Sequence, residues 1–173
     1  NGFGYSWNLF YGPFSSYGII IFTFLCKSFI TSYKIFTFVV LILSGIFMYK
    51  FMINLTQNSN TSLLASIIYL TFPYHLTDLY IRNALGEFIS FMFVPMVFLG
   101  LYKLLKTTEN HYYLIIGAVG LILTHNLSTV ITCFFCILYI LSNFKCLKQS
   151  RIKKGLIINI IFIITITSFF WAP

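Results

Sequence analysis

The chain consists of long apolar runs separated by short polar stretches. The runs cover residues 14–30, 36–53, 63–72, 85–105, 112–141 and 155–171. Many approach the roughly 20 residues that span a hydrocarbon core of about 30 Å, and the period-2 alternation of barrel strands is missing from the sequence. Only helices and closed barrels satisfy their backbone in lipid, so the pattern predicts an all-α, polytopic transmembrane bundle of about six or seven apolar helices.

Prolines and one polar pair divide these runs further. Pro73 ends the run 63–72, and Pro95 predicts a kink in the run 85–105 because proline removes a backbone donor. The run 112–141 is too long for one ordinary crossing, so we expect two helices that meet near His125 and Asn126. The segment 14–30 has two open interpretations, a membrane crossing or an external juxtamembrane helix. Aromatic residues in the preceding lead suit the headgroup level.

The composition supports a membrane protein. The chain is 59% hydrophobic and only 8% charged, which leaves too little polar surface to cover a soluble globule. Because it begins with Asn1 and ends directly after an apolar run, we expect an internal fragment of a longer protein. We expect a single transmembrane domain over residues 1–173, with an external lead and a juxtamembrane or transmembrane helix in 1–35 and the helical bundle in 36–173.

The distribution of basic residues predicts the topology. Lys and Arg in short loops stay on the cytoplasmic side, and two crossings within 112–141 place most of the basic loops together. Residues 73–84 then lie outside. Eleven Lys and Arg residues divide into three on the outside (Lys27, Lys34 and Arg82) and eight on the inside (Lys50, Lys103, Lys106, Lys145, Lys148, Arg151, Lys153 and Lys154).

The net charge of +8 does not indicate nucleic-acid binding. The basic residues are juxtamembrane, where each attracts anionic lipid by about 1 kcal/mol and helps to fix the orientation. We therefore expect membrane lipids, and no nucleic acid, as partners.

The segment from Pro73 to Glu87 is the strongest candidate for a functional site. It holds two of the three acidic residues of the chain, although an ionisable group at membrane depth costs roughly 2.5–3.5 kcal/mol on insertion scales. In a helix, Asp78 and Arg82 share a face, and Glu87 lies a little over one turn further on. One guanidinium would then bridge both carboxylates in a purely structural role. Alternatively, Arg82 binds a phosphate and a carboxylate serves as a base or metal ligand.

Three further groups carry weaker signals. His125 and Asn126 either contribute to one external cavity with Glu87 or satisfy backbone groups freed at the helix break. His75 is expected at the interface, with a ligand role as a secondary interpretation. Cys133 and Cys136 have C-x-x-C spacing in an apolar helix without a second pair, which is typical of small hydrophobic residues, so no metal site is predicted.

Several sequence segments together resemble one protein family. They are an aromatic lead (NLFYGPFSSY), a basic helix end (MYKFM), the segment LLASIIYLTFPYHLTDLYIRNALGEF, and LTHNLST between two short helices. In this order they resemble the bacterial membrane proteins related to 6-pyruvoyl-tetrahydropterin synthase, which are similar to the GT-C class of polytopic glycosyltransferases. The resemblance covers nearly the whole chain. It implies a multi-pass protein of the bacterial plasma membrane.

The resemblance to GT-C enzymes implies roles for the polar segment. The second external loop of such enzymes commonly carries an Arg followed by an acidic residue, which here correspond to Arg82 and Glu87, with Asp78 as a third candidate. Their first external loop supplies a catalytic acid, but residues 1–33 contain no Asp or Glu. The zinc-binding histidines of the soluble pterin enzyme have no counterpart here, so pterin chemistry is not implied.

The resulting hypothesis is a GT-C-like transferase that moves sugar from a polyprenyl-phosphate donor to a cell-envelope acceptor at the outer face. Glu87 and Asp78 are the candidate catalytic residues, and the candidate substrate-binding residues are Arg82, His75, His125 and Asn126. The cofactor is open, with a divalent metal as one option. The alternative is a lipid or glycan transporter, or a non-catalytic assembly protein, although the sequence shows no clear internal repeat.

Overall fold

The computed structural model describes residues 12–107 and 112–171 as helices joined by short turns, without a strand in these ranges. The all-α prediction is confirmed. The aromatic lead before residue 12 lies outside the described residues. In chain order the elements are α2 (Phe14–Cys26), α3 (Phe29–Thr56), α4 (Ser59–Thr71), α5 (Pro73–Tyr80), α6 (Leu85–Tyr102), the π-helical turn η1 (Lys103–Thr107), α7 (Tyr112–Ile122), α8 (Asn126–Ser142), the 3₁₀ turn η2 (Phe144–Lys148) and α9 (Ser150–Trp171).

Three of the described helices are long and apolar enough to cross a membrane, namely those at 29–56, 85–107 and 150–170. Three shorter apolar helices accompany them at 14–26, 112–122 and 126–142. The expected break in the run 112–141 is confirmed, because α7 ends at Ile122 and α8 begins at Asn126. The described chain is therefore a bundle of apolar helices with few polar interruptions.

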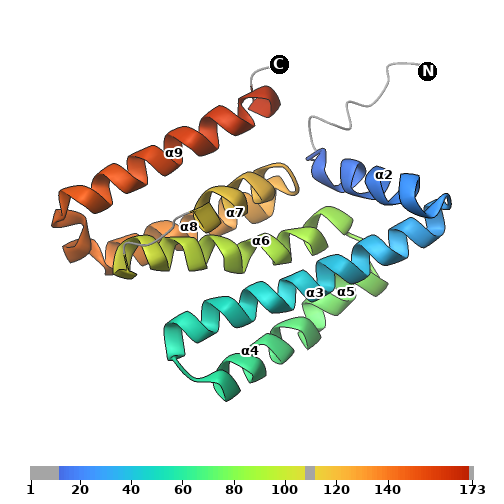
Figure 1. Ribbon diagram of the computed structural model, residues 1–173, viewed down its shortest axis with the longest axis horizontal. Helices are drawn as coiled ribbons and strands as arrows, with labels where there is room; N and C mark the ends of the chain where they lie inside the picture. The colour runs from blue at the N-terminus through green and yellow to red at the C-terminus, as the bar shows by residue number, and fades with distance from the viewer. Residues whose placement is uncertain (1–11, 108–111, 172–173) are drawn as a thin grey trace.

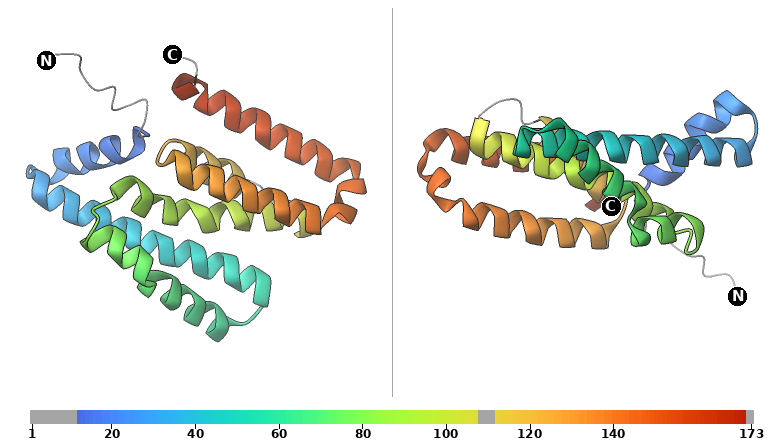
Figure 2. Two further views of the ribbon diagram at one scale, coloured as in Figure 1. Left: turned by 180° about the vertical axis from the view of Figure 1, so that it is seen from behind. Right: turned by 90° about the horizontal axis from the view of Figure 1, so that it is seen from below.

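Helix α6 lies at the centre of this bundle (Figure 1). In the most apolar stretch of this segment 72% of the residues are buried, against 28% in α3 and 17% in α9. The hairpin of α3 and α4 packs on one side of α6, and α7 and α8 pack on the other, with α9 against α7 (Figure 2). The exposed residues of α8, and those of α9 after its basic first turns, are mostly apolar, which suits contact with lipid.

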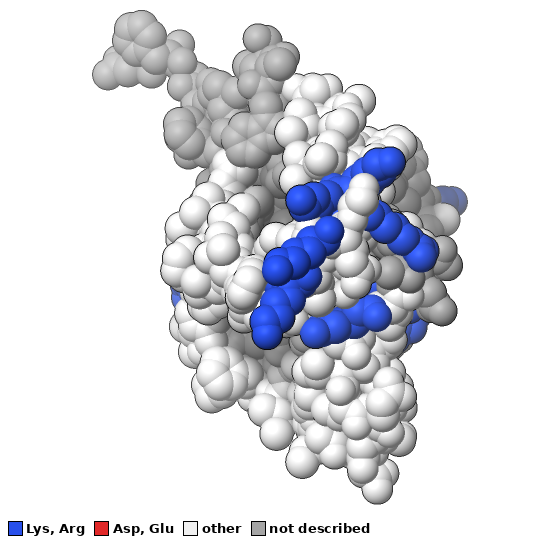
Figure 3. All heavy atoms as spheres, turned by 90° about the vertical axis from the view of Figure 1, so that its left-hand side faces the viewer, with Lys and Arg blue, Asp and Glu red and all other residues white. Residues whose placement is uncertain are grey.

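The helices alternate in direction, so their connections fall at two opposite ends. Phe51 of α3 contacts Phe98 near the end of α6, whereas Tyr33 at the start of α3 donates a hydrogen bond to Asn83 just before α6. The eight basic residues expected on one side belong to the end formed by η1, η2 and the start of α9, together with the last turns of α3. The space-filling view shows a cluster of Lys and Arg side chains on one face of the molecule (Figure 3). The grouping predicted from the loops is confirmed.

Helix α2 begins and ends at the opposite end of the bundle. Its first turn is fixed to the turn between α7 and α8, where the Phe14 backbone N–H donates to the carbonyl of Leu123 at 3.0 Å. Its last turn ends at Lys27, directly before α3 starts. Gly12 allows this contact, because a Cβ there would lie 2.0 Å from the Leu123 oxygen. Of the two interpretations of 14–30, this arrangement favours a helix that does not cross.

Helix α3 starts earlier than the sequence pattern indicated. It begins at Phe29 rather than residue 36, since the polar residues at this point form intrahelical bonds. The hydroxyls of Ser32 and Thr37 donate to carbonyls four residues earlier, at 2.6 Å and 2.9 Å. Because these polar side chains bond to carbonyls of the same segment, the helix continues through them.

The predicted external loop 73–84 contains a short helix, α5. Pro73 occupies the first position of α5, where its missing N–H costs nothing, so the proline separates α4 from α5 as expected. Pro95 lies inside α6, which continues as an α-helix to Tyr102.

Close packing between α6 and α7 depends on glycines. A Cβ at Gly100 would lie 2.2 Å from the backbone nitrogen of Leu114, and one at Gly120 would lie 2.2 Å from the ring of Phe93. Gly117 is similarly crowded. Small residues at helix contacts allow backbones to approach, and in lipid this van der Waals packing is a main source of association.

We predict that Gly100→Ala destabilises the protein by about 2 kcal/mol or more, because the methyl group meets backbone that cannot move aside. Gly45→Ala is the matched control, since its Cβ would meet side-chain atoms only, the flexible end of Leu70 at 2.8 Å and the Ser66 hydroxyl at 3.4 Å. Thermal unfolding of both variants in detergent micelles measures the difference. Equal stability of the two variants would show that α7 is not held tightly against α6.

Candidate functional site

The polar segment is held by α5 and the turn that follows it. Tyr74, Asp78 and Arg82 recur every four residues, so they lie along one side of α5 and its continuation. The helix ends where the backbone N–H groups of Ile81 and Arg82 both donate to the carbonyl of Thr77 at 2.9 Å. These bonds direct the Arg82 side chain toward the start of α6.

Asn83 reverses the chain between α5 and α6. Its φ of 50° lies in the left-handed region, which Asn tolerates better than most residues. Its side chain accepts a hydrogen bond from the Tyr33 hydroxyl of α3. The Ala84 N–H donates to the carbonyl of Asp78 at 3.0 Å, which closes the turn. Helix α6 then starts at Leu85 with Glu87 in its first turn.

Arg82 connects both carboxylates and a tyrosine. Its Nη1 lies 2.7 Å from Asp78 Oδ1, 3.1 Å from Glu87 Oε2 and 3.0 Å from the Tyr74 hydroxyl. The Tyr74 hydroxyl donates a hydrogen bond to Glu87 Oε1, and the guanidinium lies 5.6 Å from the centre of the Tyr74 ring. One guanidinium thus bridges both carboxylates, the arrangement of the first of the two interpretations that the sequence left open, and Tyr74 completes the network.

The two carboxylates have different surroundings. The side chain of Asp78 is fully buried, and its Oδ2 has no hydrogen-bond partner among the described residues, whereas the side chain of Glu87 is 15% exposed. Burial, with a contribution from the neighbouring Glu87, raises the pKa of Asp78 despite the ion pair with Arg82. Glu87 is thus the carboxylate that a molecule outside the bundle can reach.

The network also shifts the pKa values of Tyr74 and Arg82. The hydrogen bond to Glu87 raises the pKa of Tyr74, which keeps the phenol protonated. The bond to Tyr74 and the two nearby carboxylates raise the pKa of Arg82, which therefore stays charged. The cluster of Asp78, Glu87 and Arg82 has a formal charge of −1 when both carboxylates are ionised.

A cavity of about 520 Å³ opens beside this network. Its walls come from three parts of the chain, namely the first turns of α2, residues 82–87, and His125 at the start of α8. Gly86 allows the start of α6 to approach the turn between α7 and α8, since a Cβ there would lie 3.0 Å from the Thr124 oxygen. Arg82, Glu87 and His125 therefore line one cavity, which was one of the two interpretations of His125 that the sequence left open.

His125 also stabilises α8. Its Nδ1 accepts the backbone N–H of Ser128 at 3.3 Å and lies 2.8 Å from the Ser128 hydroxyl, so it acts as the N-cap. An accepting Nδ1 places the proton of the neutral ring on Nε2. The interpretation that this residue satisfies freed backbone groups is confirmed, and the same residue lines the cavity.

Two other candidates lie elsewhere. His75 is 1% exposed and stacks on Phe91 with ring centres 4.5 Å apart. The expectation that it lies at the membrane interface is therefore wrong, because the side chain is buried. Surrounding aromatic rings exclude it from the polar cavity, and its Nδ1 lies 3.2 Å from the Tyr69 carbonyl. Asn126 does not line the polar cavity either, and its Oδ1 is buried without a hydrogen-bond partner in the part of the chain that the structure describes.

Sequence reasoning missed several residues of the site. Tyr74 precedes Asp78 by four residues, a spacing that would have placed both on one helix face. Asn83, Ser15 and Ser16 line the cavity, but no local pattern distinguishes them from ordinary turn and helix residues. Their position depends on long-range packing of α2 against the other helices.

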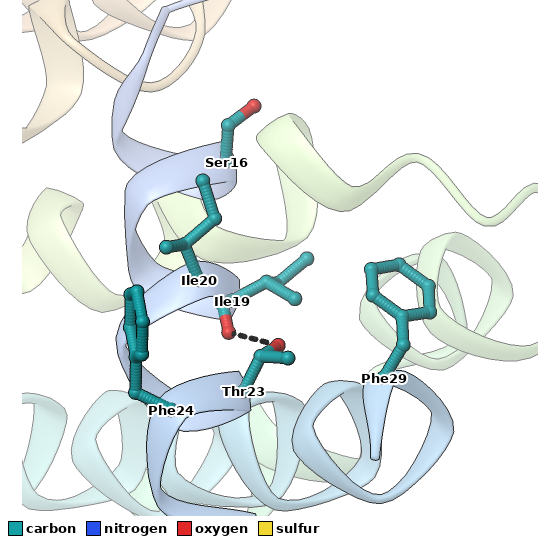
Figure 4. Close-up of a pocket in the computed structure, with 6 residues that line it drawn as sticks. All are labelled: Ser16, Ile19, Ile20, Thr23, Phe24 and Phe29. Atoms are coloured by element: carbon teal, nitrogen blue, oxygen red, sulfur yellow. Dashed lines mark hydrogen bonds between the residues drawn. The ribbon is translucent and has the colours of Figure 1, made fainter. Parts of the chain in front are cut away.

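Apolar surfaces adjoin the polar cavity on two sides. One cavity of about 460 Å³ shares Ser16 and Ile19 with it and continues along α2 toward Phe24 and Phe29 (Figure 4). The Thr23 hydroxyl there bonds back to the Ile19 carbonyl at 2.8 Å, so the surface offers mainly hydrocarbon. A second groove of about 420 Å³ starts at Glu87 and runs between α6 and α8.

Metal ligands do not converge in the described part of the chain. No group of three or more His, Cys, Asp or Glu side chains is close enough there to hold an ion. Cys133 is exposed and Cys136 is partly buried against the core, and both line an apolar cavity between α8 and its neighbouring helices.

The fold and the site define a helical membrane protein with a charged cavity at one end of its bundle. The family described as "6-pyruvoyl-tetrahydropterin synthase related domain; membrane protein" matches residues 9–173, and the chain belongs to this family. It is also similar to an uncharacterised protein of Lactococcus lactis subsp. cremoris (strain MG1363), with 31% identity over 174 residues. That match covers 97% of this chain and 28% of the relative's length. No solved structure matches.

We predict that His75 makes stability depend on pH. Burial lowers the pKa of His75, so the unfolded chain takes up a proton below about pH 6.5 that the folded state resists. This contribution to stability is therefore lost as the pH falls, at up to about 1.4 kcal/mol per pH unit. His75→Phe preserves the stacking on Phe91 and should flatten the slope between pH 7 and 5. Thermal unfolding in nanodiscs across this range measures it, and parallel slopes would refute the prediction.

Proposed function

We propose that the chain is the membrane domain, over residues 1–173, of a multi-pass transferase of the bacterial plasma membrane. In this proposal the enzyme is related to GT-C glycosyltransferases and transfers sugar from a polyprenyl-phosphate donor to a hydroxyl of a cell-envelope acceptor. The observation that supports it most is the single cavity that joins Glu87, Arg82 and His125 and adjoins apolar surfaces. The positive-inside rule assigns this end of the bundle to the outer face.

Arg82 is suited to hold the phosphate of the donor. Its side chain is 47% exposed, and its polar side-chain contacts to Asp78, Glu87 and Tyr74 all use Nη1. The planar guanidinium has five N–H donors, so Nε and Nη2 present further donors for a bidentate contact. Asp78 is buried behind Arg82 and in this proposal positions the guanidinium rather than reacting itself.

Glu87 is suited to act as the general base. It would take the proton of the acceptor hydroxyl, whose oxygen then bonds to the anomeric carbon of the sugar. The bond from that carbon to the phosphate oxygen breaks, and its electron pair leaves with the polyprenyl phosphate held by Arg82. His125 lines the same cavity with a protonated Nε2, a donor for sugar hydroxyls or the phosphate.

The apolar surfaces are suited to the lipid part of the donor. The cavity along α2 shares Ser16 and Ile19 with the polar cavity, so one molecule can place a charged head in one and a hydrocarbon chain in the other. No step is assigned to a metal, because the ligands in the described residues do not converge on one position.

The second candidate is a transporter or a non-catalytic assembly protein. Its support is the closure of the polar network, since Arg82 already contacts both carboxylates and Tyr74. Such a network stabilises the connection between α5 and α6 without any chemistry. The two candidates differ in whether the negative charge of Glu87 is needed for the product.

We predict that Glu87→Gln abolishes the glycan product while the protein remains folded. The amide preserves the shape of the side chain but cannot take a proton, and loss of a general base costs about 10²–10⁴-fold in rate. The measurement is the envelope-glycan mass profile of cells whose only full-length copy carries the variant, at matched protein abundance and compared with a deletion.

Glu109→Gln is the matched control, because it makes the same chemical change in the segment between η1 and α7 and should preserve the wild-type profile. Arg82→Ala should lose the product together with Glu87→Gln. If Glu87→Gln and Arg82→Ala both retain the wild-type glycans, the network is structural and transport or assembly becomes the better description.

A further inference from the structure

A surface groove between α3 and α5 has a cation at one end and hydrocarbon along the rest. Its volume is about 300 Å³, and it shares no lining residue with the polar cavity beside Arg82. Lys34, Phe38 and Leu41 line it from α3, and Leu79 and Tyr80 line it from α5. Lys34 is exposed, and Phe38 and Tyr80 are 62% and 76% exposed, so the groove is open to the surroundings of the bundle.

The polar and apolar residues of the groove lie at different depths along α3. Lys34 follows the first residue of α3 by five positions, about 8 Å along the axis, and Leu41 lies about 10 Å further on. Because α3 is about 12 Å longer than a hydrocarbon core of about 30 Å, Lys34 lies near the edge of the core, at the level of the headgroups. Phe38 and Leu41 then lie within the hydrocarbon. The end of α5 is beside the first turns of α3, since the Tyr33 hydroxyl donates a hydrogen bond to Asn83.

The charge of Lys34 has no described counter-ion within the protein. Both acidic side chains that the structure describes pair with Arg82, and no lining residue of the groove is acidic. A lysine at the edge of a bilayer extends its ammonium group to the headgroups, where it attracts anionic lipid. The Tyr80 hydroxyl lines the same groove and is a donor for a phosphate oxygen. The headgroup end of the groove therefore offers a cation and a neutral donor without a negative charge.

We propose that this groove binds a phospholipid with a negatively charged headgroup, such as phosphatidylglycerol. The Lys34 ammonium would bind the phosphate, the Tyr80 hydroxyl would donate to it, and one acyl chain would lie along Phe38, Leu41 and Leu79. A zwitterionic headgroup fits less well, because its ammonium group would bring a second cation next to Lys34. The proposal is independent of the polar cavity and of any transferase activity.

The experiment measures lipid binding at this groove alone, because the basic residues at the other end of the bundle also attract anionic lipid. Phe38→Trp places a fluorescent ring in the groove, and lipids with brominated acyl chains quench tryptophan on contact. Full-length protein with and without Phe38→Trp is placed in nanodiscs of phosphatidylcholine that contain increasing fractions of brominated phosphatidylglycerol or brominated phosphatidylcholine. The difference between the two proteins gives the quenching of the introduced tryptophan. We expect phosphatidylglycerol to bind about fivefold more tightly, the ratio that one basic residue gives at a membrane surface.

Lys34→Gln, combined with Phe38→Trp, isolates the role of the charge. It should remove the preference, so that the two brominated lipids quench the introduced tryptophan equally. Lys27→Gln in the same background is the matched control, because Lys27 lies at the same end of the bundle, directly after α2, and does not line the groove. This variant should retain the preference of about fivefold.

Four results would overturn the proposal. The first two are equal quenching by both lipids when Lys34 is intact, and an unchanged preference after Lys34→Gln. The third is the same loss of preference in Lys27→Gln, which would show general surface attraction instead of a site. The fourth is displacement of brominated phosphatidylglycerol by soluble glycerol phosphate, which would show that the groove takes a free phosphate and not a lipid.

Discussion

The cost of burying charge in a helical membrane protein controls how the end of the bundle with the polar cavity is organised. Asp78 is fully buried, and only Arg82 and the surrounding turn make its presence tolerable. Three features hold Arg82 in place: α5 ends at Tyr80, the chain reverses at Asn83, and α6 begins at Leu85, so that Glu87 lies in its first turn beside Arg82. The polar cavity lies beside this network, and its other walls come from α2, whose first turn is bonded to the turn between α7 and α8, and from His125 at the start of α8.

Much of this end could be predicted from local sequence. The four-residue spacing of Asp78 and Arg82, the helix break at His125 and the separation of helices at Pro73 all act within one or two turns, and each is present in the structure. The alternation of apolar runs with basic loops predicted which loops between helices lie at the same end of the bundle. These features depend on backbone geometry and hydration, which nearby residues determine.

What sequence did not predict depends on packing between distant segments. His75 resembles an interfacial histidine until Phe88 and Phe91 from α6 enclose it. The polar residues at the start of α3 suggested a break, but the helix satisfies them internally. The position of α2 rests on contacts with a turn more than a hundred residues away, and the pairing of α6 with α7 rests on glycines whose role is visible only when the facing backbone is known.

The length of α3 connects the site to the bilayer itself. Its 28 residues extend for about 42 Å, longer than a hydrocarbon core of about 30 Å, and α2 directly precedes its N-terminal end. A helix that exceeds the bilayer tilts to reduce the mismatch, and the tilt depends on lipid thickness. Since α2 forms one wall of the polar cavity, a thinner or thicker membrane would displace that wall relative to Arg82 and Glu87. Lipid composition would then set how widely the cavity opens, without any ligand bound to the protein.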